Sequence, residues 1–294
     1  MNLFIIFTIL LITAFVIGII GNAIGIGGGI FLIPFFIFYM HLSPLESSGL
    51  SLFTIMISTA GGSYIFYKDK TIDSELYLMI LVPAGLGIIA GSVLGRYVSA
   101  NQFKWLFSFI IIGIGIFSLA ATKKQTAVNV KSKNFISCTN DNDKILTKKN
   151  SIKKTVVEKN GTVHDYEIKS PLSINVFSLI AGFISGFIGI GIGGVTGTFL
   201  TAVEQIPPRI AFSTVISVMA IISFIGGLIH FYYIKNPLNL VFYIIPLGAG
   251  ALAGSKTGAF VSKNSKARTL RVYQASIIIL LGALMLLLSA LSAP

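Results

Sequence analysis

Glycine clusters interrupt two apolar stretches of this 294-residue chain. The first cluster is Gly25-Ile26-Gly27-Gly28-Gly29, and the second is Gly191-Ile192-Gly193-Gly194. Glycine breaks helices because it gains little from a fixed backbone and readily adopts positive φ angles. A helix broken at membrane depth exposes backbone N–H groups that a substrate can use. Two such breaks, one in each half of a chain, are a sequence pointer to a transporter binding site.

The chemistry that these breaks offer is anion binding. New helical segments are expected from Ile30 and from Val195, and a helix N-terminus carries about half a positive charge and unpaired N–H donors. Two facing N-termini would hold an anion without a buried Lys or Arg, and no basic residue lies near either break. The predicted substrate-binding residues are Asn22, Gly25, Gly27, Gly28, Gly29, Ser51, Gly191, Gly193, Gly194, Thr196, Ser213 and Thr214, with Thr54 and Ser217 as further hydroxyl candidates.

Each of these residue types also has a purely structural interpretation. Glycine in membrane helices mostly serves close packing, and a lone Ser or Thr commonly bonds its own backbone carbonyl. Packing is the interpretation favoured for two glycine triplets, Gly87-xxx-Gly91-xxx-Gly95 and Gly250-xxx-Gly254-xxx-Gly258, which lie 163 residues apart. The string Gly25-x-Gly27 also hints at a dinucleotide fingerprint, but no soluble βαβ unit surrounds it.

Composition indicates a polytopic helical membrane protein. The chain is 54% hydrophobic and 11% charged, whereas soluble domains carry about 25% charged residues. Residues 1–45 hold no Asp, Glu, Lys or Arg; as one helix they would extend about 68 Å, over twice the roughly 30 Å hydrocarbon core. This segment must therefore turn back, and the first glycine cluster is the obvious place. A cleaved signal peptide is the competing interpretation of residues 3–20, but it would need a basic start and a cleavage site.

The same composition argues against several other classes. A single Cys138 excludes an internal disulfide, and three His with one Cys do not make a zinc site of the usual spacing. No metal, cofactor or catalytic residue is expected. The net charge of +12 is interpreted as cytoplasmic loops rather than nucleic-acid binding. The expected partners are a small anionic substrate and the lipid bilayer, and a homo-oligomer is left open.

Two membrane halves flank a polar insertion. Apolar segments at 3–24, 28–41, 46–67, 76–97 and 103–121 pair in order with segments at 173–190, 194–206, 210–233, 238–260 and 271–291. The fold class predicted is all-α with two inverted-topology repeats, each a glycine-broken helical hairpin, re-entrant or spanning, plus three transmembrane helices. The domains are a first repeat at 1–121, a lysine-rich insertion at 122–172 and a second repeat at 173–294. The Asn160-Gly161 pair predicts a small β-hairpin within 155–168.

Charge distribution supports this inversion. The inverted arrangement places on one face Lys68, Lys70, the insertion, Arg209, Lys263, Lys266, Arg268 and Arg271. The other face receives Arg96, Lys104 and Lys235, together with both termini. The positive-inside rule then predicts a multi-pass protein of the cytoplasmic membrane, with residues 122–172 in the cytoplasm and both termini outside. His230 is interpreted as an interfacial belt residue rather than as a proton carrier.

The glycine strings bear a family resemblance. Gly25-Ile-Gly-Gly-Gly-Ile-Phe-Leu-Ile-Pro34, followed by Pro44, resembles the sulfite exporter TauE/SafE family, and residues 186–194 with Pro207-Pro208-Arg-Ile-Ala211 repeat the pattern. The resemblance covers both membrane halves and omits the insertion. It implies transport of sulfur-containing anions such as sulfite, thiosulfate or organosulfonates, commonly outward. Val195 and Leu200 depart from the first copy, where Gly29 and Pro34 stand.

We therefore expect a secondary transporter, not an enzyme, that exports a small sulfur-containing anion by alternating access. An enzyme would need a cluster of His, Asp, Glu or Cys at membrane depth, and the sequence offers none. The alternative is a membrane scaffold or signalling protein that acts through the basic 122–172 insertion.

Overall fold

The computed structural model describes residues 3–24, 28–135, 152–159, 161–235, 237–264 and 267–291. Within these residues, seven helices are long and apolar enough to cross a membrane, which confirms the predicted all-α polytopic class. The helices of the first half are α1 (Leu3–Ile24), α2 (Gly29–Pro34), the π-helical turn η1 (Phe35–Tyr39), α3 (Pro44–Lys68), α4 (Ser74–Gly95) and α5 (Ala100–Phe135). Those of the second half are α6 (Pro171–Ile188), α7 (Gly193–Ala202), α8 (Pro208–Tyr233), α9 (Pro237–Asn264) and α10 (Ala267–Leu291).

Local capping chemistry sets the helix boundaries around the α3–α4 turn. Ser43 and Glu46 form a capping box at the start of α3, which satisfies N–H groups that the first turn leaves unpaired. After α3 ends, Lys70 adopts a left-handed conformation with φ of 56°. Asp73 then caps α4, because its carboxylate accepts hydrogen bonds from the N–H groups of the first turn of that helix. The two helices therefore reverse direction in a short, well-defined turn.

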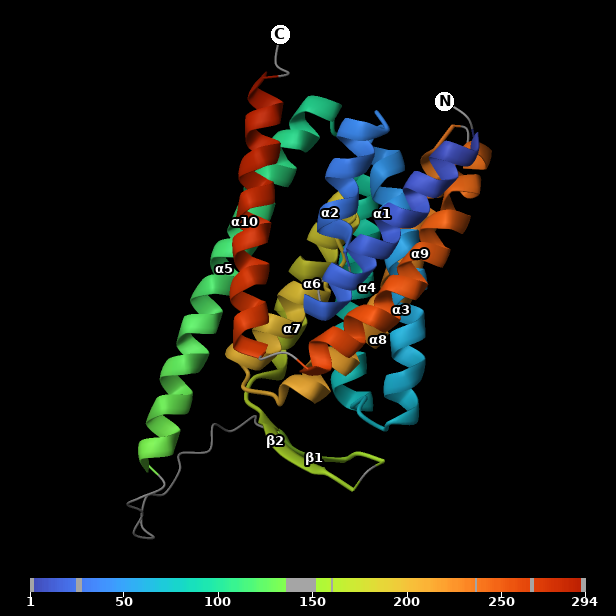
Figure 1. The fold of residues 1–294 in the computed structure, drawn as a ribbon. Helices are drawn as coiled ribbons and strands as arrows, with labels where there is room; N and C mark the ends of the chain where they lie inside the picture. The colour runs from blue at the N-terminus through green and yellow to red at the C-terminus, as the bar shows by residue number, and fades with distance from the viewer. Residues whose placement is uncertain are drawn as a thin grey trace.

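The two halves pack against each other through reciprocal helix contacts. In each half the first helix packs against the fourth helix of the other half, so that α1 contacts α9 and α6 contacts α4. The third helices, α3 and α8, pack on each other at the centre, and the last helices, α5 and α10, pair along one side of the bundle. Each contact thus has a counterpart in the other half or joins two equivalent helices (Figure 1). Each half therefore needs the other half to bury the apolar faces of its helices.

Glycine makes the α4–α6 contact close. A Cβ atom at Gly87 would lie 2.2 Å from the carbonyl oxygen of Leu179, and one at Gly91 would lie 2.1 Å from that of Phe183. Both distances are shorter than any real Cβ contact, so only glycine allows the two backbones to approach in this way.

The α1–α9 contact repeats this geometry. A Cβ atom at Gly250 would lie 2.3 Å from the carbonyl oxygen of Leu11, and one at Gly254 would lie 2.2 Å from that of Phe15. For these four glycines of the two triplets, the structure therefore supports the packing interpretation.

The basic side chains separate towards the two ends of the bundle. At the end that carries the α3–α4 turn, Arg209 lies 3.8 Å from Asp69. At the other end, the guanidinium of Arg96 stacks over the ring of Tyr233 at 4.4 Å, and Lys104 lies over the ring of Phe38. Figure 1 shows the first turn of α1 and the last turn of α10 at this second end, away from the β-hairpin.

The insertion contributes helix and strand to the described structure. Helix α5 continues past residue 121 to Phe135, and β1 (Ile152–Val157) pairs antiparallel with β2 (Val163–Ile168) around a turn in which Gly161 has φ of 85°. The inner face of this hairpin packs on the ends of α4 and α8, where Ile168 is fully buried. A lone hairpin is marginal in water, so docking on the helices stabilises it.

Polar contacts fasten the hairpin to the helices. The hydroxyl of Tyr166 donates to the carboxylate of Asp73 at 2.5 Å. Nε of Arg209 lies 2.6 Å from the buried carboxylate of Glu158, to which the His164 ring also bonds at 2.8 Å. The hairpin therefore links the cap of α4 to the first turn of α8.

Candidate functional site

The second glycine cluster ends α6 and begins α7. Gly189 and Gly191 have φ angles of 85° and 77°, values that side-chain-bearing residues rarely adopt. Gly189 closes α6 by donating its N–H to the carbonyl of Ser185, and α7 starts at Gly193. The chain thus reverses direction within four residues between the two helices.

Side chains from three other helices satisfy the carbonyl groups that this break exposes. Ser48 donates to the carbonyl of Ile188 at 2.8 Å, and Ser51 donates to that of Gly189 at 2.6 Å. His230 bonds the carbonyl of Gly186 through Nε2 at 2.8 Å, with Ser92 donating to the same oxygen at 3.4 Å. Non-helical backbone inside a membrane is stable only when protein groups pair with it. Ser51, a predicted substrate residue, is thus a hydrogen-bond donor to the break.

His230 does not lie in an interfacial belt, and that interpretation is wrong. Its side chain is only 1% exposed, and the Nε2 atom must carry the hydrogen because a carbonyl can only accept. The Nδ1 atom has no hydrogen-bond partner among the described residues. The ring therefore ties α8 to the end of α6.

The first glycine cluster meets the second one. Gly28 has φ of 84° and precedes α2, whose first residue is Gly29. A Cβ atom at Gly29 would lie 2.8 Å from the carbonyl oxygen of Ile190 and 2.7 Å from Cδ1 of Ile55. The two breaks are therefore in direct contact, although Gly29 and Ile190 are 161 residues apart in the chain. Of the other residues predicted here, Gly25 and Gly27 lie outside the described residues, as does the side chain of Asn22.

The start of α7 is buried and carries few polar partners. The N–H of Gly193 points at the sulfur of Met219, 3.2 Å away, a weak acceptor. Thr196 lies in the first turn, and its hydroxyl is buried without a hydrogen-bond partner in the described structure. The N–H groups in the first turn of α7, which carry a partial positive charge, therefore lie in an uncharged environment.

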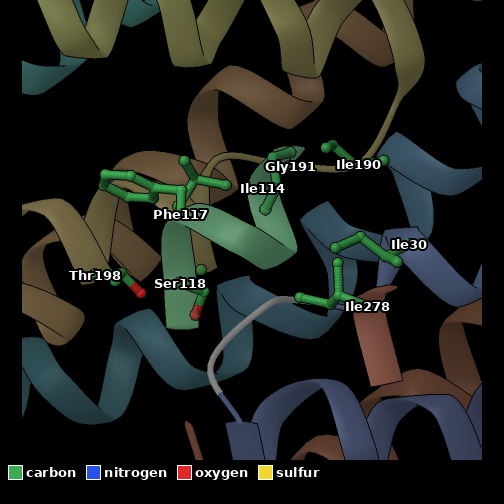
Figure 2. Close-up of a pocket in the computed structure, with 10 residues that line it drawn as sticks. Ile30, Ile114, Phe117, Ser118, Ile190, Gly191, Thr198 and Ile278 are labelled. Carbon is green, nitrogen blue, oxygen red and sulfur yellow. The ribbon is translucent and has the colours of Figure 1, made fainter. Parts of the chain in front are cut away.

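A small cavity adjoins both breaks (Figure 2). Its volume is about 10 Å³, room for roughly one water molecule. Helices α5 and α10 close its sides, and Ser118 and Thr198 supply the side-chain hydroxyl groups of its wall. Among the described residues, its lining is Ile30, Ile114, Phe117, Ser118, Ile190, Gly191, Gly194, Val195, Thr198 and Ile278. No charged residue is among them, and the described residues contain no His/Cys/Asp/Glu group that could hold a metal ion.

Two predicted hydroxyl residues lie elsewhere. Ser213 donates to the carbonyl of Thr71 at 2.7 Å, and Thr214 accepts from the N–H of Asp73 at 3.2 Å. Both therefore connect the first turns of α8 to the α3–α4 turn beside the hairpin. The structure brings together Gly28, Gly29, Gly191, Gly193 and Gly194 with Thr196, and it separates Ser213 and Thr214 from them.

Several residues that line the cavity or contact the breaks were not among the predicted site residues. Ser118 and Thr198 sit in helices with no unusual local pattern, and Met219 and Ile190 look like ordinary apolar residues. Ser48, three residues before Ser51, was the one with a visible signal, because that spacing places both hydroxyls on one face of a helix.

In the described part of the chain, seven candidate spans and two helix breaks that meet inside the bundle define a polytopic membrane protein. A family model described as "Sulfite exporter TauE/SafE" matches residues 10–285, and the chain belongs to this family. The probable membrane transporter protein YunE of Bacillus subtilis is 24% identical over 283 residues, which cover 94% of this chain and 96% of that protein. The probable membrane transporter protein MJ0441 of Methanocaldococcus jannaschii is 24% identical, with 95% of each chain covered. No solved structure matches the chain.

Proposed function

We propose that this transporter exports a small sulfur-containing anion, of the sulfite, thiosulfate or organosulfonate class, across the cytoplasmic membrane. The observation that carries the proposal is the contact between the two helix breaks, Gly29 against Ile190. This contact brings the N-terminus of α7 and the start of α2 to one place, where no acidic side chain of the described residues lines the cavity beside their N–H groups. The assignment of a sulfur-containing substrate rests on the family, whose description names sulfite.

The membrane potential favours an outward direction for an anion. With the hairpin end in the cytoplasm and both termini outside, the lysine-rich insertion lies on the inner face, as the positive-inside rule expects. A cell interior is electrically negative, so export of one negative charge is favourable by about 2.3 kcal/mol per 100 mV. Such an exporter needs no coupling ion, which is consistent with the uncharged cavity lining.

The proposed mechanism is alternating access between two inverted repeats. We interpret the structure as a closed state of this cycle, because a cavity of about 10 Å³ is too small for an oxyanion. The reciprocal α1–α9 and α4–α6 contacts pair each broken helix with the opposite half. Movement of these pairs relative to the central α3–α8 pair would open the breaks first to one side and then to the other.

The test is flux of labelled sulfite, thiosulfate, sulfate and a small sulfonate in proteoliposomes. Thr198→Val removes a cavity hydroxyl, and its matched control is Thr201→Val, because the Thr201 hydroxyl donates to the carbonyl of Gly197 in the same helix. Loss of one hydrogen bond to a charged ligand is worth about 1.5–3 kcal/mol, so Thr198→Val should raise the apparent KM about 10- to 100-fold. Saturable flux of one sulfur anion that Thr198→Val weakens and Thr201→Val preserves is the expected result. Absence of flux for all four anions, with the protein folded, contradicts the proposal.

The scaffold alternative is tested with a change in the insertion. Residues 137–150, which include Lys144, Lys148 and Lys149, are replaced with a Gly-Ser linker of equal length, so that the docked hairpin stays intact. Transport by the membrane halves should then persist at the wild-type rate. Loss of a cellular phenotype with unchanged flux would favour the scaffold.

A further inference from the structure

A second, much larger hollow lies at the hairpin end, between α3, α4 and α8. Its volume is about 1010 Å³, at the upper end of the usual size of a ligand site. Each helix contributes residues one turn apart, such as Ala60 and Tyr64 on α3 and Ser217 and Ile221 on α8. Among the residues that the structure describes, it shares no lining residue with the cavity at the glycine breaks.

The polarity of this groove changes along its length. Ala60 and Lys68 both line it, and eight helical residues span about 12 Å along an axis. Ala60, Ala220 and Ile221 make the side away from the turn mostly apolar, with the small hydroxyls of Ser63 and Ser217 beside them, whereas Lys68 and Lys70 stand at the turn end. Tyrosine rings occupy the level between, as aromatic side chains do at a membrane interface. This order, apolar then aromatic then cationic, matches a phospholipid from acyl chain to phosphate.

The two lysines are available for an anion. Within the described part of the chain neither forms an ion pair; Nζ of Lys68 lies over the ring of Tyr64, 4.5 Å from its centre. The neighbouring acids have other partners, because Glu75 pairs with Lys154 and Asp69 lies 3.8 Å from Arg209. The groove therefore presents uncompensated positive charge at one end and an apolar surface at the other.

We propose that this groove binds an anionic phospholipid of the leaflet at the hairpin end. Lys68 and Lys70 would hold the phosphate, and one acyl chain would lie against Ala60, Ala220 and Ile221. Basic pockets between membrane helices recognise anionic head groups in this way. The site is independent of which anion the transporter carries. A bound lipid would wedge between α3, α4 and α8, the helices that support the glycine breaks.

The first experiment counts lipids bound to the full chain by native mass spectrometry. Phosphatidylglycerol and phosphatidylcholine with identical acyl chains are titrated into the protein in detergent micelles. One lysine near a membrane surface is worth about 1 kcal/mol, or about fivefold in affinity. Lys68→Gln combined with Lys70→Gln should therefore weaken phosphatidylglycerol binding about 25-fold and leave phosphatidylcholine unaffected. Lys104→Gln, at the opposite end of the bundle, is the matched control and should change neither.

A second variant distinguishes lipid binding in the groove from nonspecific attraction of the lipid to the surface lysines. Ala220→Phe fills the apolar part and leaves both lysines in place, so it should also abolish retention of the single tightly bound lipid. Three results would overturn the proposal: phosphatidylglycerol affinity unchanged in the double lysine variant, affinity unchanged in Ala220→Phe, or equal retention of both lipids by the wild type. Displacement of the lipid by millimolar inorganic phosphate would also overturn it, in favour of a vestibule for a soluble anion. Thermal unfolding of each variant checks that it is folded.

Discussion

Gly29 of α2 lies against the backbone of Ile190, so that a Cβ atom at Gly29 would be 2.8 Å from the Ile190 carbonyl oxygen. This contact joins the two glycine clusters inside the bundle. The backbone of Ile190 cannot yield as a side chain can, whereas Cδ1 of Ile55, 2.7 Å from the same Cβ position, is the end of a flexible side chain. The close approach of two broken helices is thus built from backbone rather than from charged side chains.

Gly29→Ala is expected to destabilise the protein by about 1–3 kcal/mol, because the added methyl group overpacks the contact with Ile190. Gly113→Ala is the control, since a Cβ atom there would meet nothing within 4 Å; in a helix it should be neutral or stabilising by about 0.5–1 kcal/mol. Thermal unfolding in detergent micelles measures both. Equal melting temperatures for the two variants would show that the breaks are not in tight contact.

The α4–α6 contact allows a similar comparison on one helix. Gly91→Ala would place a methyl group 2.1 Å from the Phe183 carbonyl oxygen, whereas Gly85→Ala faces open space. We expect Gly91→Ala to push α4 and α6 apart and to lower stability by about 1–3 kcal/mol or more. A cysteine cross-link between facing positions of the two helices should form more slowly in this variant. If Gly91→Ala matched Gly85→Ala in melting and cross-linking, the helix pairing described above would be wrong.

Ser51→Ala should weaken the end of α6. The change leaves the carbonyl of Gly189 without its donor in a buried position, at a cost of about 1–3 kcal/mol. Thr59→Val, on the same helix, is the control because the Thr59 hydroxyl donates to the Ile55 carbonyl of its own helix. Hydrogen exchange of the 186–193 segment should rise in Ser51→Ala and remain unchanged in Thr59→Val. Unchanged exchange in both variants would remove Ser51 from its role at the break.

Docking of the β-hairpin should weaken in alkaline solution. Burial, and next the hydrogen bond to Asp73, raise the pKa of Tyr166 above its ordinary value. Because the folded pKa exceeds the unfolded one, the neutral hydroxyl stabilises docking fully below the unfolded pKa of about 10, and this contribution is lost as the pH rises beyond it.

Proteolysis of the hairpin between pH 7 and pH 11 measures this effect. Cleavage should increase above about pH 10 in the wild type, in step with the unfolded pKa of tyrosine. Tyr166→Phe should be cleaved faster at pH 7 and should lose this part of the pH dependence. The same alkaline rise in Tyr166→Phe as in the wild type would assign the effect to another group.

Local patterns were sufficient for much of this structure. The expected segment at 3–24 coincides with α1, and the other helices begin and end within a few residues of their predicted bounds, apart from α5. Proline, glycine and capping residues act on their own neighbours, so they can be read from the chain alone. Helix α5 extends to Phe135 rather than to residue 121 because no residue at that point breaks a helix.

The sequence by itself determined a helical membrane protein with two glycine-broken helices, because hydropathy and backbone freedom are local properties. Only the tertiary structure decided what meets at those breaks. Ser51 and Ser213 are both serines near the start of a long helix, yet one donates to Gly189 at the break and the other to Thr71 beside the hairpin. Likewise, His230 contacts Gly186, 44 residues away in the chain. Such contacts depend on how whole helices pack. The periodicity of one helix shows which of its faces is apolar, but it does not show which distant helix packs on that face.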